Sequence, residues 1–441
     1  MSLNNLNLAQ VLSRIGGSPF LANVTQLVSG EVVAQVVGFV ALPLLTRIYG
    51  PAAFGILGVF MAVSEVGGKI ASLRYDVALI LPERDHEAWA LFRFSATFAL
   101  CFTSVLLCST FPFRNTIATS LGVAELDPFF LFVSLMMLGI SCQSLGSYWV
   151  MRKKHFKAIA EASAGSAVIG SGLKVLVGFL GYGAGGLLMV TALQRWLNLL
   201  LIRLRTPSAI WKHPVAEGES QLQARVYIEF PKYRMPQDTL NSFTQVIPNV
   251  LLAAFFSPVA AGFYILASRI LRLPFSLLQE ALRKVFYVKA IEISRSGDSL
   301  FKLCSGMSLL IFVSLLPVAV MVIWWGSTFF EYVFGAEWRE AGIYAKWIII
   351  GVLFGFSALP SSVVIPIMGW NRFYLCYEIL TSLLRLIIAI WVAATMTVYA
   401  TVAAIILSAS ASSFVLMCIV LSRLRNEEHN PVTASSNSML S

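Results

Sequence analysis

The stretch LLIFVSLLPVAVMVIWW, residues 309–325, contains no charged side chain and decides the class of fold. Three further uncharged runs lie at Val32–Leu45, Phe129–Ile140 and Trp347–Phe356. Helical runs of about 20 apolar residues are long enough to cross the roughly 30 Å of hydrocarbon in a membrane. The whole chain is 58% hydrophobic and only 12% charged, whereas soluble domains are about one-quarter charged. Because the sequence shows little of the residue alternation of a β-barrel, it predicts an all-α membrane protein.

About twelve membrane spans are expected from the apolar segments. They are placed at roughly 24–46, 54–81, 90–111, 128–150, 158–180, 183–204, 235–256, 259–283, 302–325, 343–368, 373–396 and 399–422. The longest connection is polar and contains several prolines, so it divides the chain into two halves. The expected organisation is an N-terminal six-helix lobe at 1–204, a cytoplasmic linker at 205–234, a C-terminal six-helix lobe at 235–422 and a cytoplasmic polar tail at 423–441.

The distribution of basic residues predicts the orientation of these spans in the membrane. Lysine and arginine concentrate in alternate connections, for example in Arg152-Lys153-Lys154 and in the segment 205–234. Because cytoplasmic loops carry the excess of basic residues, both termini are expected in the cytoplasm. Residues 1–19 do not show the pattern of a cleavable signal peptide. The net charge of +10 is therefore interpreted as a topology signal of an inner-membrane protein, and not as a nucleic-acid-binding surface.

The two predicted halves resemble each other. Pro51-Ala52-Ala53-Phe54-Gly55 matches Pro258-Val259-Ala260-Ala261-Gly262, and at the same spacing Glu31 matches Asp238. With six helices in each half, both copies have the same orientation in the membrane. Repeats of this parallel kind occur in transporters, where two lobes surround a central substrate site.

Several segments together resemble one family of membrane proteins. The run Leu42–Pro51 (LPLLTRIYGP), followed by Phe54-Gly55, is similar to the first hairpin of bacterial polysaccharide flippases of the Wzx type. Leu73–Pro82 (LRYDVALILP), Arg152–Lys157 (RKKHFK) and Gly369–Arg372 (GWNR) also resemble this family. The family belongs to the multidrug/oligosaccharidyl-lipid/polysaccharide exporter (MOP) superfamily, and the similarity extends over nearly the whole chain.

The resemblance implies two six-helix bundles that form a V and open alternately to each side of the membrane. It implies a flippase of O-antigen or exopolysaccharide repeat units, whose substrate is an undecaprenyl-diphosphate-linked oligosaccharide. A polysaccharide polymerase and a chain-length regulator are implied as partners, in addition to the membrane lipid.

Charged residues at membrane depth supply the candidate binding site, because each would cost about 2.5–3.5 kcal/mol if it faced lipid. The predicted substrate-binding residues are the bases Lys69, Arg195, Arg269, Arg272 and Arg385 and the amides Asn241, Gln245 and Asn249. We expect Lys69, Arg269 and Arg272 to bind the diphosphate, because arginine forks suit phosphate oxygens. The candidates for coupling to a proton or sodium gradient are Glu31, Glu65, Asp76 and Asp238.

Structural interpretations stand beside these functional ones. Glu65 and Lys69 are one helical turn apart and could neutralise each other. Arg74 points away from Asp76 on an ideal helix, and its side chain could extend to the cytoplasmic interface. The aromatic residues around loop 326–342, among them Trp324, Trp338 and Tyr344, are expected to anchor the chain at the membrane interface.

Two other functions remain open. A multidrug or cation antiporter of the same superfamily would need a deep acidic cavity, whereas here the deep bases outnumber the deep acids. A membrane polymerase or glycosyltransferase is disfavoured by the short outside loops and by the absence of phosphate-loop, metal-cluster and nucleophile motifs. The six cysteines fall in apolar segments without paired spacing, so no metal or other cofactor is expected.

Overall fold

The fold is that of a computed structural model, which describes residues 19–296 and 298–429. The described residues form helices without any β-strand. Eleven of these helices are long and apolar enough to span a membrane by length and composition. The predicted all-α membrane fold is therefore confirmed. The chain divides into two compact units, Met1–Val250 and Leu251–Ser441, here called the N-terminal and C-terminal units.

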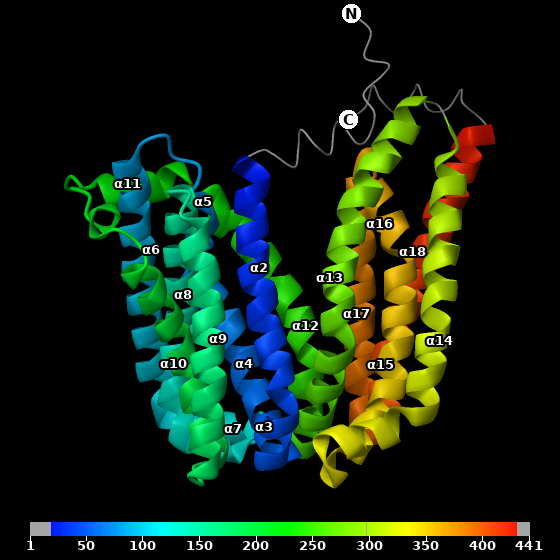
Figure 1. The fold of residues 1–441 in the computed structure, drawn as a ribbon, viewed down its shortest axis with the longest axis horizontal. Helices are drawn as coiled ribbons and strands as arrows, with labels where there is room; N and C mark the ends of the chain where they lie inside the picture. Colours follow the sequence, from blue (N-terminus) through cyan, green and yellow to red (C-terminus); the bar gives the residue numbers. More distant parts are fainter. Residues whose placement is uncertain (1–18, 297, 430–441) are drawn as a thin grey trace, which may run out of the picture. The chain divides into compact units, whose positions relative to one another are not determined.

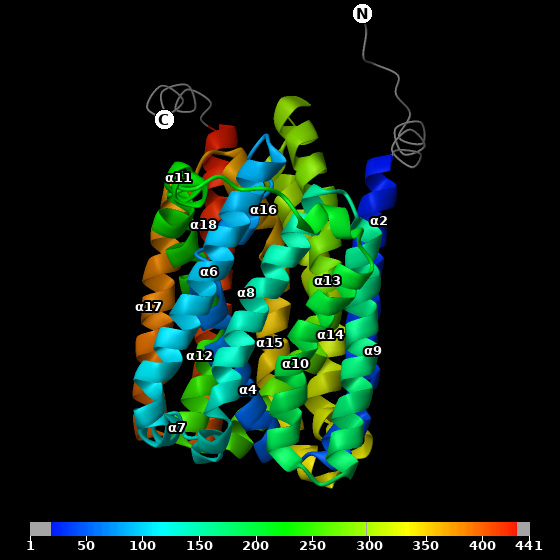
Figure 2. The ribbon, with the colours of Figure 1, turned by 90° about the vertical axis from the view of Figure 1, so that its left-hand side faces the viewer.

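The long helices of the N-terminal unit run roughly parallel to one another (Figure 1). The elements are α2 (Pro19–Val40), α3 (Leu42–Ile48), α4 (Pro51–Ala71), α5 (Tyr75–Ala78), α6 (Asp85–Thr110), α7 (Arg114–Ser120), α8 (Phe130–Arg152), α9 (Phe156–Phe179), α10 (Gly183–Leu204), α11 (Glu219–Val226) and most of α12 (Met235–Phe255). The boundary between the units lies within α12, after Val250. The central helix is α8, which packs against α4, α6 and α10. Figure 2 shows α6, α8, α10 and α9 side by side in that order.

Glycines allow α4 to approach α8 closely. A Cβ atom added at Gly67 would lie 2.4 Å from the Met137 side chain, and one added at Gly68 would lie 2.8 Å from Ile140. The Ser141 hydroxyl of α8 donates a hydrogen bond to the Gly68 carbonyl at 2.7 Å. This approach fixes the end of α4 from which the candidate site is built.

The C-terminal unit repeats the helix order of the N-terminal one. It contains α13 (Pro258–Ser296), α14 (Leu300–Phe334), α15 (Arg339–Ser357), α16 (Leu359–Ile367), α17 (Asn371–Thr395) and α18 (Val398–His429). Its central helix is α15, which packs against α13, α14 and α18. Both central helices, α8 and α15, are the fourth span of their predicted half. The prolines matched in sequence, Pro51 and Pro258, each begin a helix, α4 and α13.

The predicted span 235–256 forms α12 but is not among the eleven helices that qualify as membrane spans. Its polar residues Asp238, Asn241, Gln245 and Asn249 lower its hydropathy. A helix of this length with a polar face needs protein, water or ligand on that face if it crosses a membrane. This composition directs attention to α12 as part of a site.

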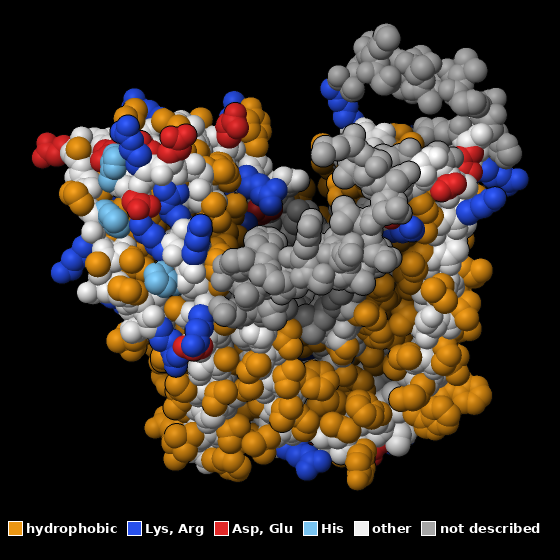
Figure 3. Space-filling view, turned by 45° about the horizontal axis from the view of Figure 1, so that its top comes forward, with side chains coloured by type: hydrophobic (Ala, Val, Ile, Leu, Met, Phe, Trp, Pro, Cys, Tyr) orange, Lys and Arg blue, Asp and Glu red, His pale blue; other side chains and the backbone are white. Residues whose placement is uncertain are grey.

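The segment predicted as a linker, 205–234, is folded onto the N-terminal unit. It contains α11, which packs against α6, and the Tyr75 hydroxyl donates a hydrogen bond to the Ala224 carbonyl at 2.8 Å. The indole of the buried Trp149 donates to the Ile210 carbonyl at 2.9 Å. In the space-filling view, charged side chains gather at the end of this unit that carries α11, and hydrophobic ones cover the helix sides (Figure 3).

The aromatic residues near loop 326–342 separate into two groups. Trp324, Trp325 and Tyr332 are exposed, as expected of interface anchors. Trp338 and Tyr344 are each only 1% exposed, and both pack edge-on against Phe263. The expectation that these two residues are interface anchors is therefore wrong, because they fill the core of the C-terminal unit.

Candidate functional site

The candidate site begins where the second predicted span is interrupted. The span was expected to be continuous, but α4 ends at Ala71 and α5 begins at Tyr75. Between them Leu73 and Arg74 have φ angles of 50° and 58°. A non-glycine residue in this left-handed region costs roughly 1 kcal/mol, and such strain is typical of functional sites. The Ser95 hydroxyl donates to the Ser72 carbonyl at 2.9 Å, so the interruption leaves this backbone group satisfied.

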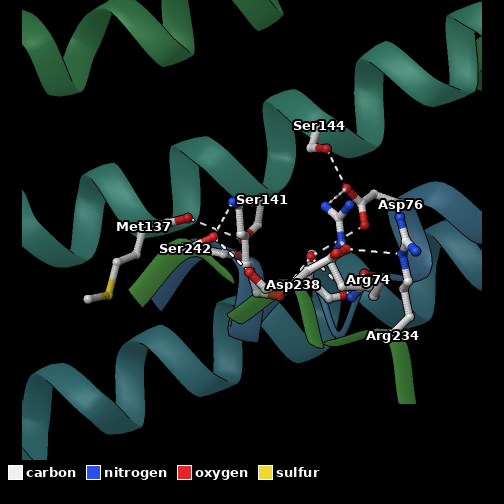
Figure 4. Close-up of polar contacts among 12 residues, drawn as sticks. Arg74, Asp76, Met137, Ser141, Ser144, Arg234, Asp238 and Ser242 are labelled. Atoms are coloured by element: carbon white, nitrogen blue, oxygen red, sulfur yellow. Dashed lines mark hydrogen bonds and ion pairs between the residues drawn. The ribbon is translucent and has the colours of Figure 1, made fainter. Parts of the chain in front are cut away.

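The interruption turns Arg74 towards two carboxylates. Its Nε donates to Asp238 Oδ2 at 2.8 Å, and its Nη1 lies 3.2 Å from Asp76 Oδ2 (Figure 4). The Asp76 carboxylate is fully buried and also accepts a hydrogen bond from the Ser144 hydroxyl of α8. Arg234 lies 3.2 Å from Asp238 on the same carboxylate oxygen. We call Arg74, Asp76, Arg234 and Asp238 the charged cluster.

Lys69 lies one turn before the interruption and extends the charged cluster along α4. Its ammonium group donates to the Ser242 hydroxyl of α12, and Ser242 in turn donates to the Asp238 carbonyl at 2.8 Å. Within the described part of the chain, Lys69 has no carboxylate partner within ion-pair distance. Its positive charge at membrane depth is therefore balanced by a hydroxyl dipole alone.

The predicted pairing of Glu65 with Lys69 is wrong. Glu65 instead lies 3.9 Å from the guanidinium of Arg195 on α10, which also donates to Gln143 at 3.3 Å. Arg195 thus has a carboxylate partner in its own unit. It stays a predicted contributor to the substrate field.

The alternative interpretation of Arg74 is also wrong. An ideal helix would have placed this side chain opposite Asp76, but the positive φ angles at Leu73 and Arg74 turn it to the same side. Sequence reasoning missed Arg74, Arg234, Ser144 and Ser242 as site residues. The only signal was the run Leu73–Pro82, which contains Arg74 and Asp76 together.

The amides predicted on α12 lie in different surroundings. Asn241 and Gln245 are exposed, whereas Asn249 is half-buried, and its Oδ1 has no hydrogen-bond partner among the described residues. On α2, Glu31 is exposed, and Gln35 Oε1 is likewise buried without a described partner. Buried polar atoms are nearly always hydrogen-bonded in native proteins. Gln35 and Asn249 therefore offer acceptors that a ligand or water can use.

Three predicted bases belong to the C-terminal unit. Arg269 and Arg272 are exposed on α13, and neither makes an ion pair or side-chain hydrogen bond within the described residues. Arg385 on α17 lies 3.1 Å from Glu378 and so has a carboxylate partner. Among the residues that the structure describes, no three His, Cys, Asp or Glu side chains come together as metal ligands.

The comparison with protein families decides the classification of the chain. The model of a family described as "Polysaccharide biosynthesis protein" matches residues 44–342. This chain belongs to that polysaccharide biosynthesis family. A curated relative, the succinoglycan biosynthesis transport protein ExoT of Rhizobium meliloti, is 25% identical over 256 residues, which are 56% of this chain and 49% of ExoT. The chain thus spans about half the length of the curated relative it matches.

Solved structures of transporters share the fold of this family member. An inward-facing multidrug resistance MATE transporter of the MOP superfamily is 13% identical, with a TM-score of 0.65 over 92% of this chain and 99% of that chain. The lipid II flippase MurJ, in an inward closed conformation, is 13% identical, with a TM-score of 0.69 over 91% of this chain and 90% of that chain. Identities this low show the fold alone, which this chain shares with both transporters. The predicted relation to polysaccharide biosynthesis proteins and the predicted all-α fold are confirmed, whereas the role as a transporter and not an enzyme stays a prediction.

Proposed function

We propose that this protein is a flippase, which moves undecaprenyl-diphosphate-linked oligosaccharide repeat units from the cytoplasmic to the periplasmic leaflet of a bacterial inner membrane. One observation carries the proposal. The segment Pro258–Ser276 of α13 is long and apolar enough to cross a membrane, yet it contains Arg269 and Arg272, exposed and without an acidic partner in the described chain. Such charges are retained at membrane depth when they face water, a counter-charge or a ligand.

The basic residues without acidic partners are chemically suited to bind a diphosphate. Guanidinium groups bind phosphate oxygens in a bidentate manner, and Lys69 adds a point charge on α4. Arg195 and Arg385 contribute positive field, and the amides Asn241, Gln245 and Asn249 of α12 offer hydrogen bonds. The prenyl tail stays in the membrane lipid while the sugar crosses through water, and alternating access moves the site from one leaflet to the other.

The charged cluster suits a conformational role in this cycle. Arg74 connects the interruption after α4 to α12 through Asp238, and Lys69 connects α4 to α12 through Ser242, so releasing α12 requires both contacts to break. Asp76 and Asp238, the carboxylates that hold Arg74, are candidates for coupling to a proton gradient. Glu31, which is exposed, and Glu65 remain candidates for the same coupling or for sodium. We infer that a polysaccharide polymerase and a chain-length regulator act on the exported product.

The antiporter alternative finds less support. Binding of an organic cation needs an unneutralised acid at depth, but Asp76, Asp238 and Glu65 are each paired with an arginine. Among the described residues Arg269 and Arg272 have no acidic partner, and of the candidate acids Glu31 alone makes no ion pair. A cation-efflux assay in whole cells separates the two functions, because export of polysaccharide and resistance to cationic drugs are independent measurements.

Complementation of a flippase-null strain tests the proposal. The wild-type chain should restore surface polysaccharide, and the null strain should accumulate the lipid-linked repeat unit on the cytoplasmic leaflet. Restored efflux of a cationic drug without restored polysaccharide would contradict the proposal. Reporter fusions test the orientation: fusions after Arg234 and Arg425 should be cytoplasmic, and one after Glu337 should be periplasmic.

A further inference from the structure

A second polar site lies within the C-terminal unit, in a cavity of about 400 Å³. Five helices line it: α13 supplies Gln279 and Arg283, α17 supplies most of the polar side chains, α15 contributes Gly355, and α16 and α18 supply further residues. Volumes of this size are typical of small-molecule sites. The proposed contacts of the diphosphate do not use this cavity.

The sequence of α17 explains why the cavity is polar. Tyr374, Glu378 and Arg385 are separated by four and seven residues, so they share one face of the helix, which lines the cavity. Leu380 and Leu383 lie on the opposite face and are exposed, as suits contact with lipid tails. α17 is therefore amphipathic within an apolar span, and its polar face is turned into the unit.

The charges of the cavity do not cancel. Arg385 Nη2 lies 3.1 Å from Glu378 Oε1 and 3.1 Å from the Ser382 hydroxyl, and its Nε donates to the Thr381 carbonyl at 3.2 Å. Arg283 has no ion pair within the described residues. Of the charged side chains described in the lining, two are basic and one is acidic, so the cavity has an excess of one positive charge.

Donors and acceptors face the cavity together. Among the described residues, the Tyr374 hydroxyl, the Gln279 amide and the Arg283 guanidinium have no hydrogen-bond partner. The second carboxylate oxygen of Glu378 also lacks one and can accept from a hydroxyl. In contrast, the Tyr377 hydroxyl donates to the Ser412 carbonyl at 2.5 Å, which connects α17 to α18.

This combination selects the chemistry of the ligand. A phosphate would gain from Arg283 but would be repelled by Glu378, and it offers the carboxylate fewer hydroxyl hydrogens than a sugar does. A sugar offers hydroxyls that both donate and accept, and its apolar ring face packs on an aromatic side chain such as Tyr374. The excess positive charge adds the requirement of one anionic group.

We infer that this cavity binds an acidic sugar residue, with Arg283 on its carboxylate and with Glu378 and Tyr374 on its hydroxyls. The inference rests on the proposed function, since the sugar belongs to the transported oligosaccharide. Arg272 and Arg283 are about 16 Å apart along α13 at the rise of an α-helix, so a diphosphate and a sugar of one molecule can occupy separate places on the same helix.

Binding of defined probes to the purified full-length protein in detergent tests this site. The probes are the acidic disaccharide glucuronyl-β-1,4-glucose, the neutral disaccharide cellobiose, and pyrophosphate, and binding is measured by calorimetry or by saturation-transfer NMR. The acidic disaccharide should bind about tenfold more tightly than cellobiose, as one charge-assisted hydrogen-bonded contact allows. Arg283→Gln should remove this preference, whereas Arg283→Lys should keep part of it.

Matched variants separate the two sites. Arg269→Gln with Arg272→Gln should weaken pyrophosphate and leave the acidic disaccharide unchanged, and Arg283→Gln should do the reverse. Thermal unfolding shows whether each variant is folded. If Arg283→Gln is not folded, Arg283→Lys is used in its place. Equal binding of both disaccharides, or loss of pyrophosphate binding in Arg283→Gln, would overturn the inference. Unchanged pyrophosphate binding in the double variant would instead overturn the proposed diphosphate contacts.

Discussion

The N-terminal and C-terminal units deal with charges at membrane depth in different ways. In the N-terminal unit Arg74 lies between Asp76 and Asp238, and Arg195 lies near Glu65. In the C-terminal unit Arg269 and Arg272 are exposed and have no acidic partner within the described chain. For these residues the cost of a charge at membrane depth is met by pairing within the N-terminal unit, whereas in the C-terminal unit it requires water or a ligand. Each unit has one exception, since Lys69 has no carboxylate partner within the described chain and Arg385 is paired with Glu378. The difference separates charges that are paired within the fold from charges that are available for the proposed transport.

The largest effect on transport is expected from the unpaired arginines. Replacing both Arg269 and Arg272 by alanine should lower polysaccharide export more than about tenfold. Each arginine would lose its hydrogen-bonded contact to a charged phosphate, which is stronger than a contact between neutral groups. Export is measured by complementation in a flippase-null strain, with protein amounts followed by immunoblot.

The stability of this double variant sharpens the comparison. Exposed side chains without partners contribute within about 0.5 kcal/mol to folding, so thermal unfolding in detergent should hardly change. Replacement of both arginines by lysine should restore only part of the export, since lysine keeps the charge and loses the fork. Full export from the alanine variant would show that the diphosphate is bound elsewhere.

The charged cluster should show the opposite behaviour. Arg74→Ala leaves Asp76 buried and without its cation, so we expect a loss of about 3–5 kcal/mol in the free energy of unfolding. The measurement is thermal stability by fluorescence-detected size-exclusion chromatography. Adding Asp76→Asn to the same chain should recover part of the loss, because the buried charge is then gone. An Arg74→Ala variant as stable as wild type would mean that the cluster does not hold α12 to the interruption.

The smallest effect is expected at the partly exposed pair. The side chains of Arg195 and Glu65 are 34% and 39% exposed, and their charged atoms lie 3.9 Å apart. Pairs of this kind contribute about 0–1 kcal/mol, so Arg195→Gln should shift thermal stability little. Glu65→Gln serves as the matched control from the other side of the pair. A destabilisation as large as that of Arg74→Ala would show that the pair of Arg195 and Glu65 stabilises the fold as strongly as the charged cluster does.

Much of the fold could be predicted because the lengths of the apolar segments can be read directly from the sequence. The predicted spans 158–180 and 183–204 correspond to α9 (Phe156–Phe179) and α10 (Gly183–Leu204). The polar stripe of α12 was also visible, since Asp238 and Asn241 stand out in an apolar segment. These features depend on local composition alone.

The rest depends on contacts that local composition does not encode. The interruption after α4 contains neither glycine nor proline, so nothing at Leu73 or Arg74 signalled a positive φ angle. The ion-pair partner of Glu65 could not be predicted from its neighbours in sequence either. The partner is Arg195, which lies on a helix far along the chain. Trp338 has the composition of an interface anchor, and only its packing against Phe263 shows that it is core.

The folding of 205–234 onto α6 and α8 has a consequence for how the protein is made. Tyr75 and Trp149 find their hydrogen-bond partners at Ala224 and Ile210, and Lys69 finds Ser242, all before Val250. Every partner of these side chains therefore precedes the C-terminal unit in the order of synthesis, and the earlier half of the chain needs no residue of the later unit to make these contacts. If the gene were divided after Val250, the first polypeptide would still contain the segment 205–234 and Ser242, which supply these hydrogen-bond partners.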